Sequence, residues 1–265
     1  TPPTRTGYEF LGWYTEATGG SKWDFAVGLT ESITLYAQWK QVQFTVSGTV
    51  VDNKGTAAQS AKVVLKQGST EVDSGTTDEN GAFTFSKYVP AGAYNIVIIY
   101  TPAGGEKQTT TTLVTITDSD QTVTVTLPPA GVISHLEVDG STPAVVVGGL
   151  DEEATELKTE GVSKVAVTMT VEAQTEAAAA GAGAIQQQAG TAATLEYLEL
   201  KVTKTVTKDG GTAVVENVSE TTTVLEIVVP FDFTGKEDVK VYRYHGSSAE
   251  TLTAATDGTK TEGTY

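Results

Sequence analysis

Short runs in which apolar and polar side chains alternate, each ended by a turn signal, constrain this chain more than any other feature. The run from Phe44 to Val51 alternates in this way and is followed by residues 52–55, DNKG. A period of two is the pattern of a strand with one buried face. Asp, Asn and Gly are favoured in turns. The sequence therefore predicts a mainly β fold built from many short strands.

The length and composition favour several small folded modules. The chain has 265 residues, of which 39% are hydrophobic and 19% charged. That apolar content is enough for hydrophobic cores and too high for a disordered chain. We expect three modules in series, at residues 1–40, 41–129 and 130–265, which are called the first, second and third modules below. Residues 128–131, PPAG, are interpreted as a short linker.

Charge and cysteine content exclude several classes of function. The formal net charge is −16, and residues 130–265 hold 21 Asp and Glu against 9 Lys and Arg. Binding to nucleic acid is disfavoured, because affinity for phosphates depends on Lys and Arg. The chain contains no Cys, so thiolate metal sites and Cys nucleophiles are absent. No run of 18 apolar residues occurs, so we predict no membrane insertion.

The first module contains all three tryptophans, Trp13, Trp23 and Trp39, together with several Tyr and Phe residues. A module of 40 residues needs large side chains, since each aromatic supplies much of the apolar area that can be buried. The sequence GYEFLGWYTEATGGSKWDF followed by ITLYAQW resembles the Listeria–Bacteroides repeat of bacterial surface proteins. That resemblance implies a small β-grasp-like module. Family members begin with a further strand, so this module is expected to be incomplete at its N-terminus.

The second module shows strand patterns at 44–51, 61–65, 82–85, 96–100, 108–117 and 121–127. Asn80-Gly81 is the residue pair that a tight hairpin prefers. The segments SGTV, TDENGAFTF and VPAGAYNIVI resemble the carboxypeptidase regulatory-like family, which implies a transthyretin-like β-sandwich. Related pilin domains carry a crosslink between a Lys of the first strand and an Asn of the last. Strands 43–51 and 121–127 lack these residues, so we expect no such crosslink.

The third module is rich in Val and Thr, with candidate strands at 143–147, 163–172, 194–207, 221–229 and 238–244. Residues 175–188 are the best candidate for a short helix, and Asp151-Glu152-Glu153 is expected to open a helical turn. The segments VVPFDFTGK and VKVYRYHG resemble the last folded region of multidomain surface proteins of gut Firmicutes. Those regions normally continue further, so we expect this module to be truncated and the chain to be part of a longer protein.

Few residues are candidates for chemistry. His135 and His245 are the two histidines, and no G-x-S-x-G, H-E-x-x-H or phosphate-binding glycine motif accompanies them. We expect His245 to pack at a strand end beside Tyr242 and Tyr244 and to have no catalytic role.

Carboxylates at Asp78, Asp118 and Asp120 are candidate calcium ligands, because calcium binds oxygen donors. They lack the D-x-D-x-D-G spacing, and turns account for them, so no metal or other cofactor is predicted. Trp13, Trp23 and Trp39 are candidates for stacking on sugar rings. The alternative, which we favour, is that they form the core of the first module.

The sequence as a whole predicts a non-enzymatic structural or stalk region on the outside of a bacterial, Gram-positive cell, with adhesin activity as a contribution. The alternative is a binding module for host glycan or host protein. Other modules of the same surface protein are the remaining expected partners. An open pocket joining His135 or His245 to a carboxylate and a hydroxyl would instead favour an enzyme.

Overall fold

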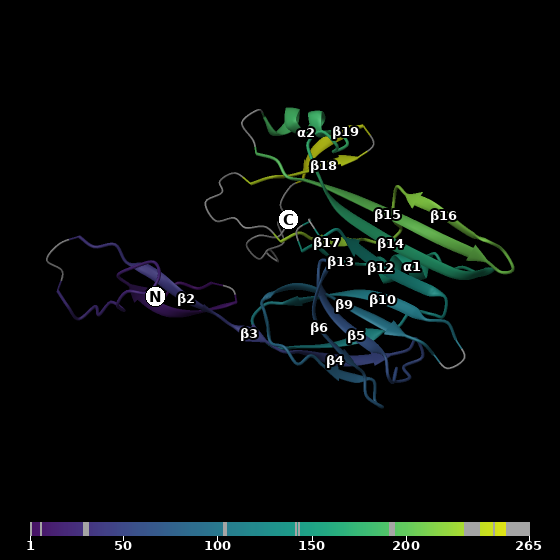
Figure 1. The fold of residues 1–265 in the computed structure, drawn as a ribbon, viewed down its shortest axis with the longest axis horizontal. Coiled ribbons are helices and arrows are strands. Elements are labelled where there is room, and N and C mark those ends of the chain that lie inside the picture. Colours follow the sequence, from purple (N-terminus) through teal and green to yellow (C-terminus); the bar gives the residue numbers. More distant parts are fainter. Residues whose placement is uncertain are drawn as a thin grey trace.

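The computed structural model describes residues 2–5, 7–28, 32–102, 105–140, 142, 144–190, 194–230, 239–245 and 247–252. Strands dominate this part of the chain, so the predicted mainly β fold class is confirmed. Figure 1 shows the first module projecting from a larger body, in which the second and third modules lie side by side. The predicted series of modules is thus folded back between its second and third members.

The first module is a two-stranded antiparallel sheet of β1 (Tyr8–Tyr14) and β2 (Tyr36–Gln41). Neither of the two hydrophobic cores of the described residues includes a side chain from this module. The β-grasp-like arrangement stays a prediction, since residues 2–5, 7–28 and 32–41 contain no other strand of two or more residues.

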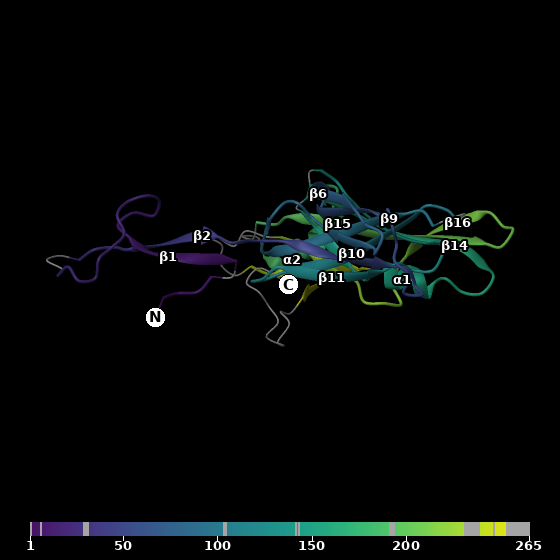
Figure 2. The ribbon, with the colours of Figure 1, turned by 90° about the horizontal axis from the view of Figure 1, so that it is seen from below.

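The first module continues into the second without a flexible linker. Only Val42 separates β2 from β3 (Gln43–Phe44), and β4 (Val46–Val51) begins two residues later. Val42 packs against the core of the second module, and its N–H donates to the carbonyl of Gly7. Figure 2 shows this nearly unbroken extended segment joining the projection to the body. The direction of the first module is therefore tied to the second.

The second module is a β-sandwich, as predicted. One sheet has the order β10-β9-β5-β6, the other β11-β4-β7, and the short pair β3-β8 closes one end. The strand bounds are β5 (Lys62–Gln67), β6 (Thr70–Thr76), β7 (Ala82–Thr84), β8 (Val89–Pro90), β9 (Gly92–Tyr100), β10 (Gln108–Ile116) and β11 (Gln121–Thr126). Its core is filled by alternate residues of these strands, such as Tyr94, Ile96 and Ile98 of β9.

The prediction of a tight hairpin at Asn80-Gly81 is wrong, because the strands on the two sides of the turn do not pair with each other. The turn exists, because Gly81 N–H donates to the Asp78 carbonyl and Gly81 has a φ of 75°. However, β7, which follows the turn, pairs with β4 and not with the preceding β6. The turn thus carries the chain from one sheet of the sandwich to the other.

The third module is built on a four-stranded sheet with the order β12-β14-β15-β16. A two-stranded sheet, β13-β17, and the short helix α1 complete its core, which includes Val165, Val167 and Met169. The bounds are β12 (Val132–Val138), β13 (Val146–Gly148), α1 (Leu150–Glu156), β14 (Val162–Gln174), β15 (Tyr197–Lys208), β16 (Ala213–Val218) and β17 (Glu226–Val228).

A small helix-and-hairpin unit follows at the end of the described chain, formed by α2 (Ala182–Ala189), β18 (Val241–His245) and β19 (Ser248–Leu252). The helix predicted at 175–188 is thus shorter at its N-terminal side. Gly181 is left-handed with a φ of 70°, and a Cβ there would lie 2.3 Å from the Tyr244 ring. The glycine is needed for this close approach, and it also sets the start of α2.

Within the described residues, no helix is long and apolar enough to cross a membrane. The part of the VVPFDFTGK segment from 231 to 236, and the last residues, 253–265, lie outside the described residues.

Candidate functional site

Two of the three tryptophans share one face of the first module. The ring of Phe10 lies 5.1 Å from Trp39 and 5.8 Å from Trp13, centroid to centroid. A bulge between Phe10 and Gly12 shifts the register of β1, so that Trp13 joins the face of Phe10. Phe10, Trp13 and Trp39 are all half-buried, and we call them the aromatic face. The structure therefore brings Trp13 and Trp39 together on a partly accessible surface.

Trp23 is placed differently from the other two. Its backbone N–H donates to the Trp13 carbonyl at 2.7 Å, which lays residues 21–23 along the edge of β1. Its side chain is also half-buried, whereas the nearby Phe25 is 70% exposed. Whether these tryptophans bind a ligand stays a prediction.

The three aspartates suggested as calcium ligands accept hydrogen bonds from the protein, Asp78 and Asp118 within their own turns and Asp120 from another strand. Asp78 accepts backbone hydrogen bonds from Asn80 and Ala82, both at 2.8 Å. Asp120 accepts from Thr45 N–H at 2.7 Å, and Asp118 accepts from the hydroxyl of Thr117. No cluster of three or more potential metal ligands occurs among the described residues.

Both histidines lie on strands, His135 on β12 and His245 at the end of β18. His135 lies in β12, partly exposed, with Nε2 3.6 Å from a carboxylate oxygen of the exposed Glu137. His245 ends β18 as predicted, but it is exposed. Tyr242 and Tyr244 lie on the opposite face of that strand, because side chains alternate. The expected packing of His245 beside both tyrosines is therefore wrong.

The most specific polar arrangement lies between the second and third modules. Asn95 of β9 is only 2% exposed, and its side chain points away from its own core. Its Nδ2 donates to the Val147 carbonyl at 2.6 Å, and its Oδ1 accepts from Val147 N–H at 3.0 Å. The amide thus pairs with the backbone of β13 as a neighbouring strand would. Nδ2 also donates to the carbonyl of Thr112 at 3.1 Å.

A second buried pair joins the edge strands β10 and β12. Thr111 N–H donates to Ser134 Oγ at 2.8 Å, and the Thr111 hydroxyl donates to the Ser134 carbonyl at 3.3 Å. Both residues are fully buried. These bonds give the buried N–H and hydroxyl of Thr111, on the free edge of β10, hydrogen-bond partners without extending the sheet.

Apolar residues fill the space around these hydrogen bonds. Val64 and Val146 are 5% and 1% exposed, yet neither belongs to the core of its own module. A Cβ on Gly148 would lie 3.1 Å from Cβ of Leu113, so glycine lets β13 pack closely against β10. We call this set of contacts, between β9 and β10 on one side and β12 and β13 on the other, the junction.

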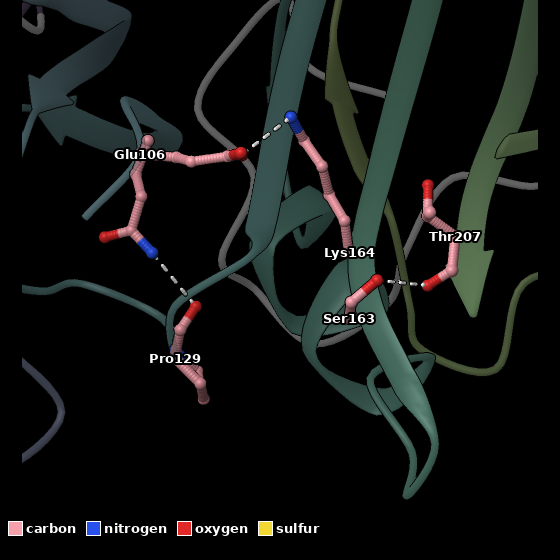
Figure 3. A network of polar contacts seen from close by, with 6 residues as sticks. Glu106, Pro129, Ser163, Lys164 and Thr207 are labelled. Carbon is pink, nitrogen blue, oxygen red and sulfur yellow. Dashed lines mark hydrogen bonds and ion pairs between the residues drawn. The ribbon is translucent and has the colours of Figure 1, made fainter. Parts of the chain in front are cut away.

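Polar contacts at the rim of the junction are shown in Figure 3. Lys164 of β14 lies 3.3 Å from a carboxylate oxygen of Glu106, and both side chains are exposed. Gln108 Nε2 donates to the Pro129 carbonyl at 3.1 Å, which fastens the residues interpreted as a linker to the second module. Residues 128–131 therefore do not act as a free hinge.

Beside the junction, α1 contains a buried acid, Glu153, that is 1% exposed. One of its oxygens, Oε2, accepts four hydrogen bonds at 2.8–3.0 Å, from the backbone and hydroxyl groups of Thr222 and Thr223. Burial raises the pKa of Glu153, but these hydrogen bonds outweigh it and lower the pKa below its usual value. Glu153 thus holds the segment before β17 against the helix.

Asp151, in the first turn of α1, has the opposite environment. Burial, followed by the neighbouring Glu152 carboxyl, raises its pKa to about 7. Its Oδ1 is buried and makes no hydrogen bond. As expected, Asp151, Glu152 and Glu153 open a helix, and the pKa values of Asp151 and Glu153 are shifted in opposite directions.

An open groove of about 640 Å³ runs along the junction. Threonines, glycines, Leu113 and Val224 line most of it, and Glu152 and Glu226 are its ionisable side chains. Neither histidine lines the groove.

The sequence did not indicate the junction, although one signal for it was present. Asn95 interrupts an apolar run, from Tyr94 to Tyr100, in a strand where Asn is disfavoured. A buried polar residue at such a position requires a specific partner.

The fold defines a chain of tandem β modules, and two of them match known families. Residues 1–38 match the Listeria-Bacteroides repeat domain, and residues 45–128 match the carboxypeptidase regulatory-like domain. Both resemblances inferred from the sequence are confirmed.

Among individual proteins, Internalin H of Listeria monocytogenes is 51% identical over 49 residues, which are 18% of this chain. The match spans only 9% of Internalin H. The major pilin subunit of Bacillus cereus has 24% identity and a TM-score of 0.24, covering 36% of this chain and 33% of the pilin. The 5-hydroxyisourate hydrolase of Klebsiella pneumoniae has 19% identity and a TM-score of 0.25, covering 31% of this chain and 90% of the hydrolase. Structural likenesses at these scores carry no argument about function.

Proposed function

We propose that this chain is a structural, non-enzymatic segment of a bacterial cell-surface protein, and that it acts as a semi-rigid spacer. The observation that carries the proposal is the absence of a free hinge between the described modules. Val42 alone separates strands of the first and second modules, and the Asn95–Val147 pair fixes the second module to the third. A spacer needs such fixed joints, because flexible linkers would let its modules collapse together.

The sequence similarities support a location outside the cell. Residues 1–38 match the Listeria-Bacteroides repeat domain, and one of the matched curated relatives is an internalin. The absence of Cys is consistent with a surface protein of a Gram-positive bacterium. Extracellular localisation, contact with other modules of the same protein and a contribution to adhesion are therefore parts of the proposal.

Small-angle X-ray scattering tests the spacer function. We expect an elongated particle whose maximum dimension and flexibility do not change with ionic strength, since the joints are buried. Asn95→Ala should increase flexibility, whereas Asn217→Ala, at an exposed site on β16, should not. A compact particle, or a flexible chain in the unmodified protein, would contradict the proposal.

A second candidate function is binding of a glycan at the aromatic face. The observation that favours it is that Phe10, Trp13 and Trp39 share one face and remain half-exposed, as a surface that stacks on sugars requires. Titration of tryptophan fluorescence with soluble host and cell-wall glycans tests it. Trp39→Ala should abolish the response, while Tyr36→Ala on the opposite face of β2 should retain it. No change with any glycan would remove this candidate.

A further inference from the structure

We propose that the pairing of β4 with β11 is a mechanical lock, which resists unfolding when the second module is pulled along the chain. The proposal rests on the spacer function, because a surface spacer carries tension between the cell and what it holds. It concerns a property that the spacer function alone does not require, namely the order in which bonds break under load.

The lock follows from the direction of two strands. The chain enters the sandwich through β3 and then β4 and leaves it through β11, and β4 and β11 are paired in parallel. Six residue pairs are in register, from Val46 with Gln121 to Val51 with Thr126. Tension pulls the start of β4 one way and the end of β11 the other way. The two strands must then slide past each other, and all their hydrogen bonds are loaded together.

Additional hydrogen bonds close both ends of this pairing. At the entry end, Thr45 N–H donates to Asp120 Oδ1 at 2.7 Å, and Gln121 N–H donates to the Thr45 carbonyl at 2.9 Å. At the exit end, Leu127 N–H donates to the Val51 carbonyl at 2.7 Å. The strands therefore cannot begin to separate from a frayed end.

Close packing holds the middle of the pairing. A Cβ on Gly48 would lie 2.1 Å from the Val123 carbonyl oxygen, so glycine is required for the strands to approach this closely. Ser47 and Thr49 face Thr122 and Thr124, with hydroxyl oxygens 3.3 and 3.4 Å apart. On the other face, Val46, Val50 and Val125 are buried in the core, which keeps water away from the bonds.

The absence of Cys allows the pulling direction to be chosen freely, because handles attach only to introduced thiols. Lys40→Cys with Ala130→Cys pulls β4 and β11 from opposite ends and loads the lock in shear. Lys40→Cys with Ser119→Cys pulls them from the same end and opens the pairs one after another. All three positions are exposed, so both double variants should keep the native fold and melting temperature.

Optical-tweezers unfolding of the full chain gives the test. We expect a rupture force several-fold higher for the Lys40–Ala130 geometry than for the Lys40–Ser119 geometry, because unfolding under force is governed by the barrier along the pulled direction. Equal forces in the two geometries would overturn the proposal. If forces are equal while scattering still shows an elongated particle, the lock fails and the spacer function stands.

A side-chain variant locates the lock. Asp120→Ala removes the bond to Thr45 at the entry end and should lower the rupture force in the shear geometry. Asp118→Ala is the matched control, since Asp118 accepts from Thr117 within its own turn. An equal loss of force with Asp118→Ala would indicate general destabilisation and contradict the proposal.

Discussion

Single polar residues in apolar surroundings decide how the second and third modules fit together. Asn95 uses its amide as a substitute for a strand backbone, and Ser134 uses its hydroxyl to satisfy an edge N–H. Both are buried, so each bond is protected from competition by water. Neither residue type in a strand predicts such a role by itself, because the partner comes from another module.

Removal of the Asn95 amide should destabilise the chain strongly. Asn95→Ala leaves the N–H and carbonyl of Val147 buried without partners, at a cost of about 2 kcal/mol or more. Urea unfolding should therefore show a lower midpoint than for the exposed control Asn217→Ala, which should match the unmodified protein. Equal midpoints for the two variants would mean that water replaces the amide at the junction.

Glu153 predicts a specific response to acid. Its folded pKa is lowered, so its stabilising effect is complete above the unfolded pKa and is lost as the pH falls through the folded pKa. Glu153→Gln removes the charge and should cost about 1–3 kcal/mol at neutral pH. When the pH is lowered from neutral to below the ordinary glutamate pKa of 4.5, the melting temperature of Glu153→Gln should fall less than that of the unmodified protein.

Glu156→Gln is the control for this prediction, because Glu156 is exposed on the same helix. A parallel acid response in the unmodified protein and in Glu153→Gln would show that the carboxylate is not what holds Thr222 and Thr223.

At the level of elements, the sequence predicted most strands of the second module, since turn residues separate its alternating runs clearly. In the third module, β14 and β15 were predicted almost fully, but β12 and β16 were missed. Ser134, His135 and Glu137 break the apolar pattern of β12, and Ser134 is explained only by the junction. Most of β16 is exposed, so its sequence, AVVENV, has no buried face to detect.

Asp151 in helix α1 predicts a loss of stability as the pH rises from its ordinary pKa of 3.8 to its folded pKa of about 7. Its folded pKa of about 7 lies above its ordinary value of 3.8, so the unfolded state releases the proton first. Stability from this group is therefore greatest below pH 4 and falls as the pH rises to about 7. Asp151→Asn should raise stability at pH 8 by on the order of 2 kcal/mol and leave it nearly unchanged at pH 4.

Chemical denaturation at the two pH values measures this effect. Asp209→Asn is a suitable control, because Asp209 is an exposed loop residue. An Asp151→Asn variant that is less stable than the unmodified protein at pH 8 would show that the carboxylate is bound by a group on the protein.

For the whole molecule, separate modules in series were predicted, whereas the second and third share a buried junction. Composition and periodicity report only whether a face is buried. They do not report which module covers that face. From the sequence alone, Val64 and Val97 could belong to the core of the second module as well as to the junction. In the first module the sequence overestimated burial. Its aromatic residues suggested a core, but its tryptophans are half-exposed.

The junction predicts shared unfolding. Calorimetry should give one transition for the second and third modules together, because separating them exposes Asn95, Thr111, Ser134 and the valines between them. Combining Asn95→Ala with Ser134→Ala should split this transition into two. Two transitions in the unmodified protein would mean that each module folds independently of the other.

The extended segment through Val42 has a consequence for display. A strand that runs from one module into the next cannot rotate about its axis without breaking the hydrogen bonds on both sides of the crossing. The aromatic face therefore keeps a fixed orientation relative to the sandwich. A partner that binds the aromatic face would therefore be held at a set angle to the rest of the chain.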